Sequence, residues 1–88
     1  MKLELTFHAD PAHGWAQVPK TIITDLGLER LISHYSYVDN HSVYLEEDCD
    51  LGLFMNKAEE LGWSITFKDN FTNHDSPVRN KHRYTKSN

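Results

Sequence analysis

The segment from Tyr35 to Asp50 constrains the fold of this 88-residue chain more than any other part. Two extended stretches, 33–38 and 42–46, overlap this segment, and Asp-Asn-His separates them. Asp and Asn tolerate the backbone conformations of tight turns. The acidic residues 46–50 then lead directly into the longest amphipathic stretch of the chain. The segment therefore predicts a β-hairpin followed by a helix.

The remaining hydrophobic pattern places further strands and helices around this hairpin. Alternation predicts a half-buried strand over 2–8, a short returning strand over 15–18 and a last strand over 63–68 with its apolar residues inward. Residues 19–26 and 51–61 carry apolar residues at helical spacing, and a glycine follows each stretch. We therefore predict an α+β domain of order β-β-α-β-β-α-β, with an antiparallel or mixed sheet and two helices on one face.

Length and charge distribution limit the class of protein. We expect a single domain over residues 1–70, followed by a polar, basic loop and tail over 71–88. Residues 1–70 carry 5 basic and 12 acidic residues, so this body attracts basic surfaces and repels nucleic acid. No apolar run approaches the roughly 18 residues of a membrane span, and the N-terminus reads as a strand rather than a signal peptide. We therefore expect a cytoplasmic protein without membrane contact.

The acidic run is the main candidate for a binding surface. Helix capping by Asp48 or Asp50 explains part of it, because negative charge at a helix N-terminus stabilises by about 0.3–1 kcal/mol per group. The other interpretation is a docking patch for a lysine- or arginine-rich partner, with tyrosines as rigid contact area. The residues assigned to this patch are Glu46, Glu47, Asp48, Asp50, Tyr35, Tyr37 and Tyr44. Cys49 lies within the run and is expected to be a packing residue, because surrounding carboxylates oppose thiolate formation.

Two further clusters favour alternative functions. His8, Asp10 and His13 flank a proline-containing loop, and with the acidic run they offer the ligands of a metal-binding module or a small metal-dependent enzyme. Their spacing matches no standard zinc motif. The second cluster is a basic strip that suits phosphate contacts with nucleic acid. Its residues are Arg79, Lys81, Arg83 and Lys86.

Three short motifs stand out in the chain: His13-Gly-Trp15, Tyr35-Ser-Tyr37 and Tyr44-Leu-Glu-Glu-Asp-Cys-Asp50. They resemble a group of small uncharacterised proteins of bacteriophages, plasmids and other mobile elements, and the likeness covers nearly the whole chain. It implies an accessory protein of a mobile element and no particular activity. A fainter likeness, over residues 18–27 and the hairpin, is to swapped-hairpin transition-state regulators. That family presents basic residues to DNA, whereas this hairpin is acidic, so DNA binding is not expected.

The sequence favours an acidic binding protein rather than an enzyme. The expected partner is a host protein with a basic surface, such as a nucleic-acid enzyme or a defence complex that binding would inhibit. We expect neither catalytic residues nor a cofactor, because the chain has no phosphate loop, nucleophile–base arrangement or dinucleotide fingerprint. The ten aromatic residues also favour a homodimer that buries an aromatic face.

Overall fold

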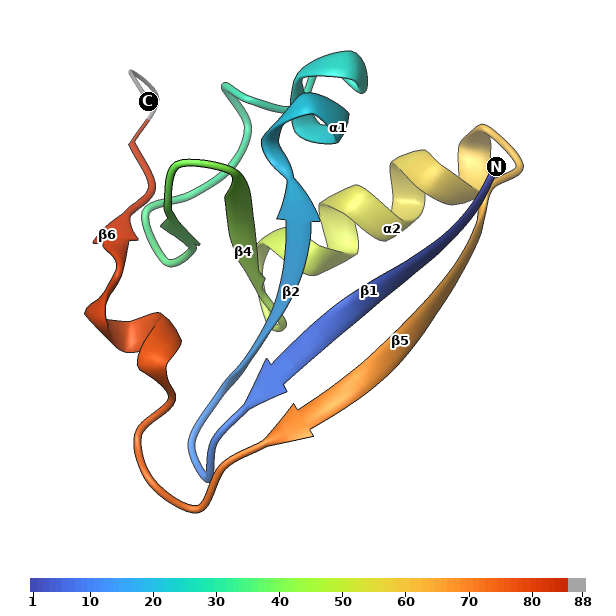
Figure 1. Cartoon of the computed structure of the whole chain (residues 1–88). Helices are drawn as coiled ribbons and strands as arrows, with labels where there is room; N and C mark the ends of the chain where they lie inside the picture. Colours follow the sequence, from blue (N-terminus) through green and yellow to red (C-terminus); the bar gives the residue numbers. More distant parts are fainter. Residues whose placement is uncertain (86–88) are drawn as a thin grey trace.

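The computed structural model describes residues 1–85 and confirms the α+β class (Figure 1). Six strands of residues 1–85 form one mixed sheet in the order β5-β1-β2-β4-β3-β6. The elements are β1 (Lys2–Ala9), β2 (Gly14–Pro19), α1 (Lys20–Asp25), β3 (Tyr37–Val38), β4 (Ser42–Glu46), α2 (Asp50–Glu60), β5 (Ser64–Phe71), the 3-10 helix η1 (Pro77–Asn80) and β6 (His82–Arg83). Within residues 1–85, no helix is both long and apolar enough to cross a membrane.

The pairing of β2 with β4 determines which loops meet at the end of the sheet. β1 pairs antiparallel with β2 and parallel with β5, which makes the sheet mixed. The chain leaves β2 through α1, forms β3, and then returns with β4 between β2 and β3. As a result the β1–β2 loop lies beside the end of β4, where the backbone N–H of Glu47 donates to the carbonyl of Gly14 at 3.0 Å.

One apolar core lies between the sheet and both helices. Alternate residues of the strands face this core, and each fully buried Val, Leu, Ile or Phe side chain stabilises the fold by about 1.5–3 kcal/mol. The central members are Leu5, Val18, Val43 and Leu45 from the sheet, Ile23 from α1, and Phe54 from α2. Because both helices contact the same cluster, they pack on one face of the sheet, as predicted.

The strand predicted over 33–38 is shorter in the structure, because Asp50 holds its first half in a turn. The backbone N–H of Ser33 donates to both carboxylate oxygens of Asp50 at 3.1 Å, and the Ser36 hydroxyl donates to the same carboxylate. Only Tyr37–Val38 remain as β3. The expected N-cap role of Asp48 or Asp50 is also wrong, since Cys49 occupies the N-cap position of α2 without a side-chain capping bond.

The C-terminal segment, defined as residues 76–84, is part of the fold instead of extending as a tail (Figure 1). Val78 of η1 packs on the sheet face opposite the helices, β6 pairs with β3 as an edge strand, and Tyr84 reaches the core on the helix side. Val78 and Tyr84 are only 2 % and 3 % exposed. The backbone N–H of Tyr84 donates to the carbonyl of Ser36 at 2.9 Å, and its hydroxyl donates to the carbonyl of Glu29. Val78 and Tyr84 therefore anchor the otherwise polar C-terminal segment to the rest of the domain.

Candidate functional site

Part of the sheet face opposite the helices is covered by η1 and the cations that flank it. Val78 completes a buried cluster with Trp15, Tyr37 and Tyr44. Three cations of the C-terminal segment each lie over one of these rings and add a cation–π attraction of about 0.5–2 kcal/mol. They are Arg79 over Trp15 at 5.0 Å, Lys81 over Tyr44 at 5.0 Å, and Arg83 over Tyr37 at 4.6 Å.

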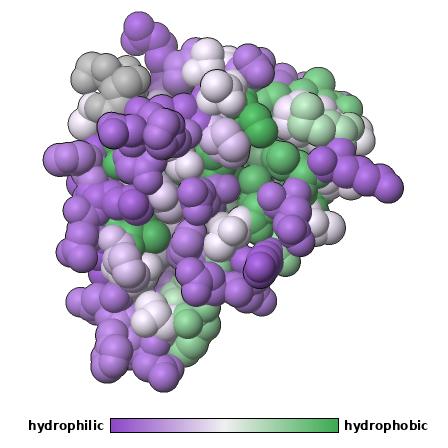
Figure 2. All heavy atoms as spheres, in the orientation of Figure 1, coloured by the Kyte–Doolittle hydropathy of each residue, from purple (hydrophilic) through white to green (hydrophobic). Residues whose placement is uncertain are grey.

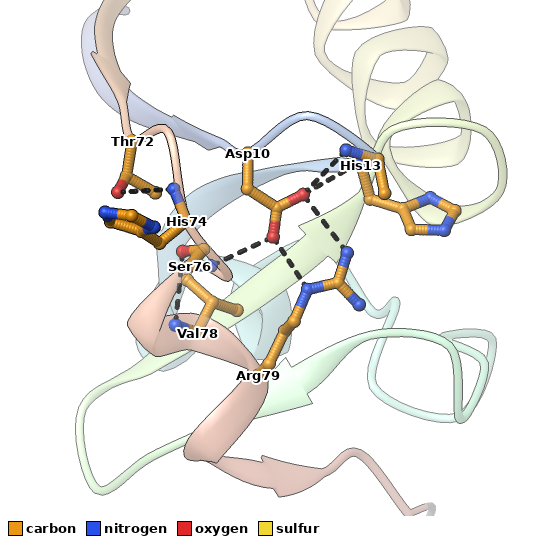
Figure 3. Close-up of polar contacts among 8 residues, drawn as sticks. Asp10, His13, Thr72, His74, Ser76, Val78 and Arg79 are labelled. Carbon is orange, nitrogen blue, oxygen red and sulfur yellow. Dashed lines mark hydrogen bonds and ion pairs between the residues drawn. The ribbon is translucent and has the colours of Figure 1, made fainter.

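Asp10 joins the β1–β2 loop to the C-terminal segment (Figure 3). Its buried carboxylate accepts hydrogen bonds from the backbone N–H groups of Ala12 and His13, both at 3.0 Å. It also accepts from the backbone N–H of Ser76 at 2.9 Å and from the Arg79 guanidinium at 2.7 and 3.1 Å. The Arg79 guanidinium, helped by these N–H groups, outweighs burial and holds the pKa of Asp10 far below its ordinary value.

Asp39 joins the β3–β4 turn to the C-terminal segment, as Asp10 does for the β1–β2 loop. Its carboxylate accepts from the backbone N–H groups of His41 at 2.9 Å and Ser42 at 2.8 Å, and from the Tyr44 hydroxyl at 2.7 Å. Lys81 lies 3.2 Å from the same carboxylate. Burial raises the pKa of Asp39, but these hydrogen bonds outweigh burial, so its pKa is lowered overall. Burial and the bond to Asp39 raise the pKa of Tyr44.

Acid is expected to destabilise the protein, because folding lowers the pKa values of both Asp10 and Asp39. Their ordinary pKa is 3.8, so their contribution is complete above about pH 5 and is lost as pH falls through the lower folded values. The free energy of unfolding then falls by up to about 1.4 kcal/mol per pH unit for each group. Urea unfolding should give equal midpoints at about pH 7 and 5 and a lower one at about pH 3. A midpoint unchanged at the lowest pH would contradict the assigned hydrogen bonds.

The acidic run divides into two inward and two outward carboxylates. Glu46 and Asp50 are 7 % and 5 % exposed. Both oxygens of Glu46 accept from the backbone N–H of Asp48, at 2.8 and 3.0 Å. Glu47 and Asp48 are exposed, and their carboxylates form no hydrogen bond or ion pair with other residues of the range 1–85. Of the four acidic residues assigned to a docking patch, only these two face outward.

The three tyrosines assigned to the same patch also separate. Tyr35 is 53 % exposed and stacks on the ring of His34 with centroids 4.5 Å apart. Tyr37 and Tyr44 are buried beneath the C-terminal segment. Tyr35 is therefore the tyrosine that the fold leaves available for contact with a partner.

A hollow of about 300 Å³ lies where the three sequence motifs and the C-terminal segment meet. Half of its lining residues carry aromatic rings, and its polar groups carry both signs of charge. It is lined by His13, Trp15, Tyr35, Tyr37, Glu46, Cys49, Arg79 and Arg83. The indole N–H of Trp15 is buried and has no acceptor among residues 1–85. The hollow thus joins residues from all three of the clusters that the sequence suggested separately.

The thiol of Cys49 in this hollow is not activated. Partial desolvation, followed by the carboxylates of Glu46, Asp50 and Asp48, raises its pKa. A thiol becomes nucleophilic only as the thiolate, and neighbouring negative charge disfavours that form. The environment of Cys49 is therefore unsuited to nucleophilic catalysis.

The rim of the hollow brings one imidazole and two carboxylates together. A ring nitrogen of His13 and carboxylate oxygens of Glu46 and Asp48 all lie within 4.8 Å of one another. Figure 3 shows the His13 ring turned away from Asp10, so only its backbone takes part in the Asp10 network. We refer to His13, Glu46 and Asp48 as the rim cluster.

His8 and Asp10, the other members of the expected metal site, do not join the rim cluster. The His8 ring hydrogen-bonds to Gln17 at 2.9 Å and to Asn70 at 3.2 Å. The Asp10 carboxylate is taken up by its loop and the C-terminal segment. The prediction combined His8, Asp10 and His13 with the acidic run. Pairing of β2 with β4 brings carboxylates of that run to His13, whereas His8 and Asp10 are bound elsewhere.

The basic strip does not form a free row of cations. Arg79 and Lys81 form ion pairs within the chain, and Arg83 donates to the carbonyl of His34 at 3.3 Å. Lys86 lies outside the described residues. The cations that are described attach the C-terminal segment to the sheet, so their positions do not favour phosphate binding.

β5 forms an uncovered edge of the sheet. It is the outermost strand, and seven of its eight residues are exposed. Phe67 and Phe71 are 38 % and 61 % exposed, and the Phe67 ring meets Phe7 edge-on at 6.1 Å. Figure 1 shows the β1–β5 ribbon extending beyond α2. Phe67 was predicted to point inward, but its side chain remains partly exposed. Figure 2 shows that the side of the molecule with the C-terminal segment is mostly hydrophilic.

Alternate backbone N–H groups of β5 point away from the sheet. The N–H of Ser64 donates to the carbonyl of Met1, and that of Thr72 to the carbonyl of Ala9, both at 2.9 Å. In a parallel ladder every second residue donates to the same neighbour, so even-numbered residues face β1 and odd-numbered residues face outward. The outward amides are those of Ile65, Phe67, Asp69 and Phe71.

Comparison with protein-family models, with curated proteins and with solved structures finds no match to this chain. No activity can therefore be transferred from a relative. Two features of the molecule bear most directly on function: the uncovered edge of β5 and the rim cluster.

Proposed function

We propose that this chain is a non-enzymatic protein-binding module that accepts an extended segment of a partner along β5. The observation that carries the proposal is an eight-residue outer strand with exposed side chains and outward amides. Folded proteins usually shorten, cover or bend such edges, because an open edge pairs with other chains. An added strand would form main-chain hydrogen bonds with β5, and side-chain contacts would supply specificity.

The two faces of β5 define the chemistry of the partner segment. On the helix side, Ile65, Phe67 and Phe71 continue an apolar surface that includes Phe7. The opposite face of β5 is polar. A strand that continues both faces must alternate apolar and polar residues. Because residues 1–70 carry 5 basic and 12 acidic residues, the polar positions of the partner are expected to be basic.

In the mobile-element setting that the sequence resemblance implies, this partner is a host protein with a basic surface. Occupation of that surface would block the contacts that the host protein makes with its own ligands. Glu47 and Asp48 remain outward and strengthen the negative field that steers a basic partner toward the domain.

Replacing Asp69 with proline tests the edge. The Asp69 N–H faces outward, so proline removes a donor offered to the partner while the bonds from β5 to β1 remain, and edge strands tolerate proline. Asp69→Ala removes the same side chain but keeps the N–H, which makes it the matched control. Both variants carry a photoreactive phenylalanine analogue in place of Phe71, and crosslinking to the partner is measured in host cells. The Asp69→Ala variant should crosslink. The yield of crosslinked product should be lower by about ten-fold or more with Asp69→Pro, which corresponds to about 1.4 kcal/mol of binding free energy.

Equal crosslinking by the two variants would contradict binding along β5. Circular dichroism and urea unfolding should show that both variants keep the fold, so that a lost crosslink reports the edge. A crosslink to a second copy of the chain would instead assign the edge to a homodimer. In that case light scattering should show a concentration-dependent dimer with Asp69→Ala and a monomer with Asp69→Pro.

A further inference from the structure

We propose that the rim cluster of His13, Glu46 and Asp48 binds a divalent transition-metal ion. This site is separate from the edge of β5 and does not depend on partner binding. The three ligand atoms lie within 4.8 Å of one another. Ligands bound to one Zn²⁺ at about 2.0–2.2 Å are about 3.3–3.6 Å apart, so small side-chain rotations complete the site.

Sheet pairing holds the backbone of the three residues in place. Trp15, two residues after His13, pairs with Glu46 across β2 and β4. On the other side, the loop that carries His13 is closed by Asp10, whose backbone N–H donates to the His13 carbonyl at 2.9 Å. The ligands therefore project from a fixed framework, and metal binding does not have to order a loop.

Glu46 provides the rigid ligand of the cluster. Its side chain is buried, and both oxygens accept from the backbone N–H of Asp48 at 2.8 and 3.0 Å. Each carboxylate oxygen has two lone pairs, so these bonds leave capacity for a metal ion. Hydrogen bonds of this kind orient metal ligands. His13 and Asp48 are exposed and can turn toward the ion that Glu46 fixes.

The charges at the rim favour a dication. Neither Glu46 nor Asp48 has an ion-pair partner in the part of the chain that the structure describes. The two guanidinium groups that line the hollow are engaged elsewhere: Arg79 with Asp10, and Arg83 with the ring over which it lies. Carboxylates held close together repel one another, and a bound cation removes this repulsion. The Asp48 carboxylate makes no hydrogen bond with other residues of the range 1–85, so its oxygens remain available for an ion.

The ligand types select the class of metal. An imidazole with two carboxylates suits Zn²⁺, Mn²⁺, Co²⁺ or Ni²⁺, whereas Mg²⁺ and Ca²⁺ prefer oxygen ligands alone. Three protein ligands leave coordination positions for water or an external group. Cys49 lines the same hollow but does not belong to the cluster.

Titration of the untagged protein with Zn²⁺ by isothermal calorimetry tests the site. One ion per chain is expected, and His13→Ala and Asp48→Asn should each weaken binding by about ten-fold or more, or about 1.4 kcal/mol. Two matched controls should bind as tightly as the unmodified chain. They are Glu47→Gln, which removes the neighbouring exposed carboxylate, and His41→Ala, which removes an exposed histidine elsewhere. Bound Co²⁺ should also show ligand-field absorption that His13→Ala abolishes.

Absence of Zn²⁺ binding at millimolar metal would overturn the site, and so would unchanged affinity in His13→Ala. Because His13 and Asp48 are exposed, both variants should keep the urea midpoint of the unmodified chain. Loss of binding would then reflect a lost ligand and not a lost fold. These outcomes are independent of the Asp69 variants, so failure of the metal site leaves binding along β5 unaffected, and the reverse is also true.

Discussion

Replacing Asp10 with alanine is expected to lower the free energy of unfolding by about 3 kcal/mol. The buried carboxylate receives hydrogen bonds from its own loop, from Ser76 and from Arg79, so alanine leaves several buried donors without an acceptor. This loss of stability is at the lower end of the range for breaking a buried ion pair, because the Arg79 side chain is 28 % exposed and can reach water once Asp10 is removed. Urea unfolding followed by tryptophan fluorescence measures the change.

Asp75→Ala is the matched control for Asp10→Ala, since Asp75 is an exposed aspartate beside the same segment. It should change the free energy of unfolding by less than about 0.5 kcal/mol. The Asp10 variant should also become more susceptible to protease within residues 72–85, because its C-terminal segment loses its attachment to the β1–β2 loop. Equal unfolding midpoints for the two variants would contradict the role assigned to Asp10.

Replacing Tyr84 with alanine is expected to cost about 3–5 kcal/mol, the range for removal of a large buried aromatic side chain. Tyr84 is 3 % exposed and belongs to the main core, although it lies near the end of a polar stretch. Against a total stability of about 5–15 kcal/mol for a domain, this loss brings the protein close to unfolding. Chemical denaturation at neutral pH measures the effect.

Tyr84→Phe separates the packing of Tyr84 from its hydrogen bond. Phenylalanine keeps the ring and removes only the hydroxyl that donates to the Glu29 carbonyl, so the expected cost is about 0.5–1.5 kcal/mol. If the alanine variant were as stable as the phenylalanine variant, Tyr84 would not be a core residue. The C-terminal segment would then be a tail, as the sequence alone suggested.

Local pattern was sufficient to predict most of the elements. The alternation of β1, the helical spacing of α2 and the terminating glycines are properties of neighbouring residues, and a sequence displays them directly. Gly27 and Gly62 have φ values of 70° and 74°, the left-handed backbone that favours glycine after a helix. The order of elements up to β5 and the placement of both helices on one face followed from these signals.

Features that depend on distant contacts could not be predicted in this way. The stretch before Tyr37 reads as a strand, but Asp50 binds Ser33 and Ser36 and holds them in a turn. Likewise, residues 76–84 read as a tail because Val78 and Tyr84 are isolated in polar sequence. The one local signal was Ser76-Pro77, in which the serine hydroxyl accepts from the N–H of Val78 and caps η1.

The candidate sites show the same division. The sequence suggested a metal site from the histidine cluster together with the acidic run, but it did not indicate that His13, Glu46 and Asp48 are the members that meet. Only the pairing of β2 with β4 brings them together, and no local pattern reports which strands will be neighbours. The open edge of β5 was also hidden, because an alternating strand looks the same whether it is central or outermost in the sheet.

Amide hydrogen exchange along β5, measured by NMR on the isolated protein, tests the central claim that this strand is an open edge. The account predicts alternation: the amides of Thr66, Lys68 and Asn70, which face β1, should be protected, whereas those of Phe67 and Asp69 should exchange rapidly. Protection of both sets in dilute protein would mean that the edge is already covered. Rapid exchange of both sets would mean that β5 does not pair with β1. Either result would contradict binding of a partner along β5.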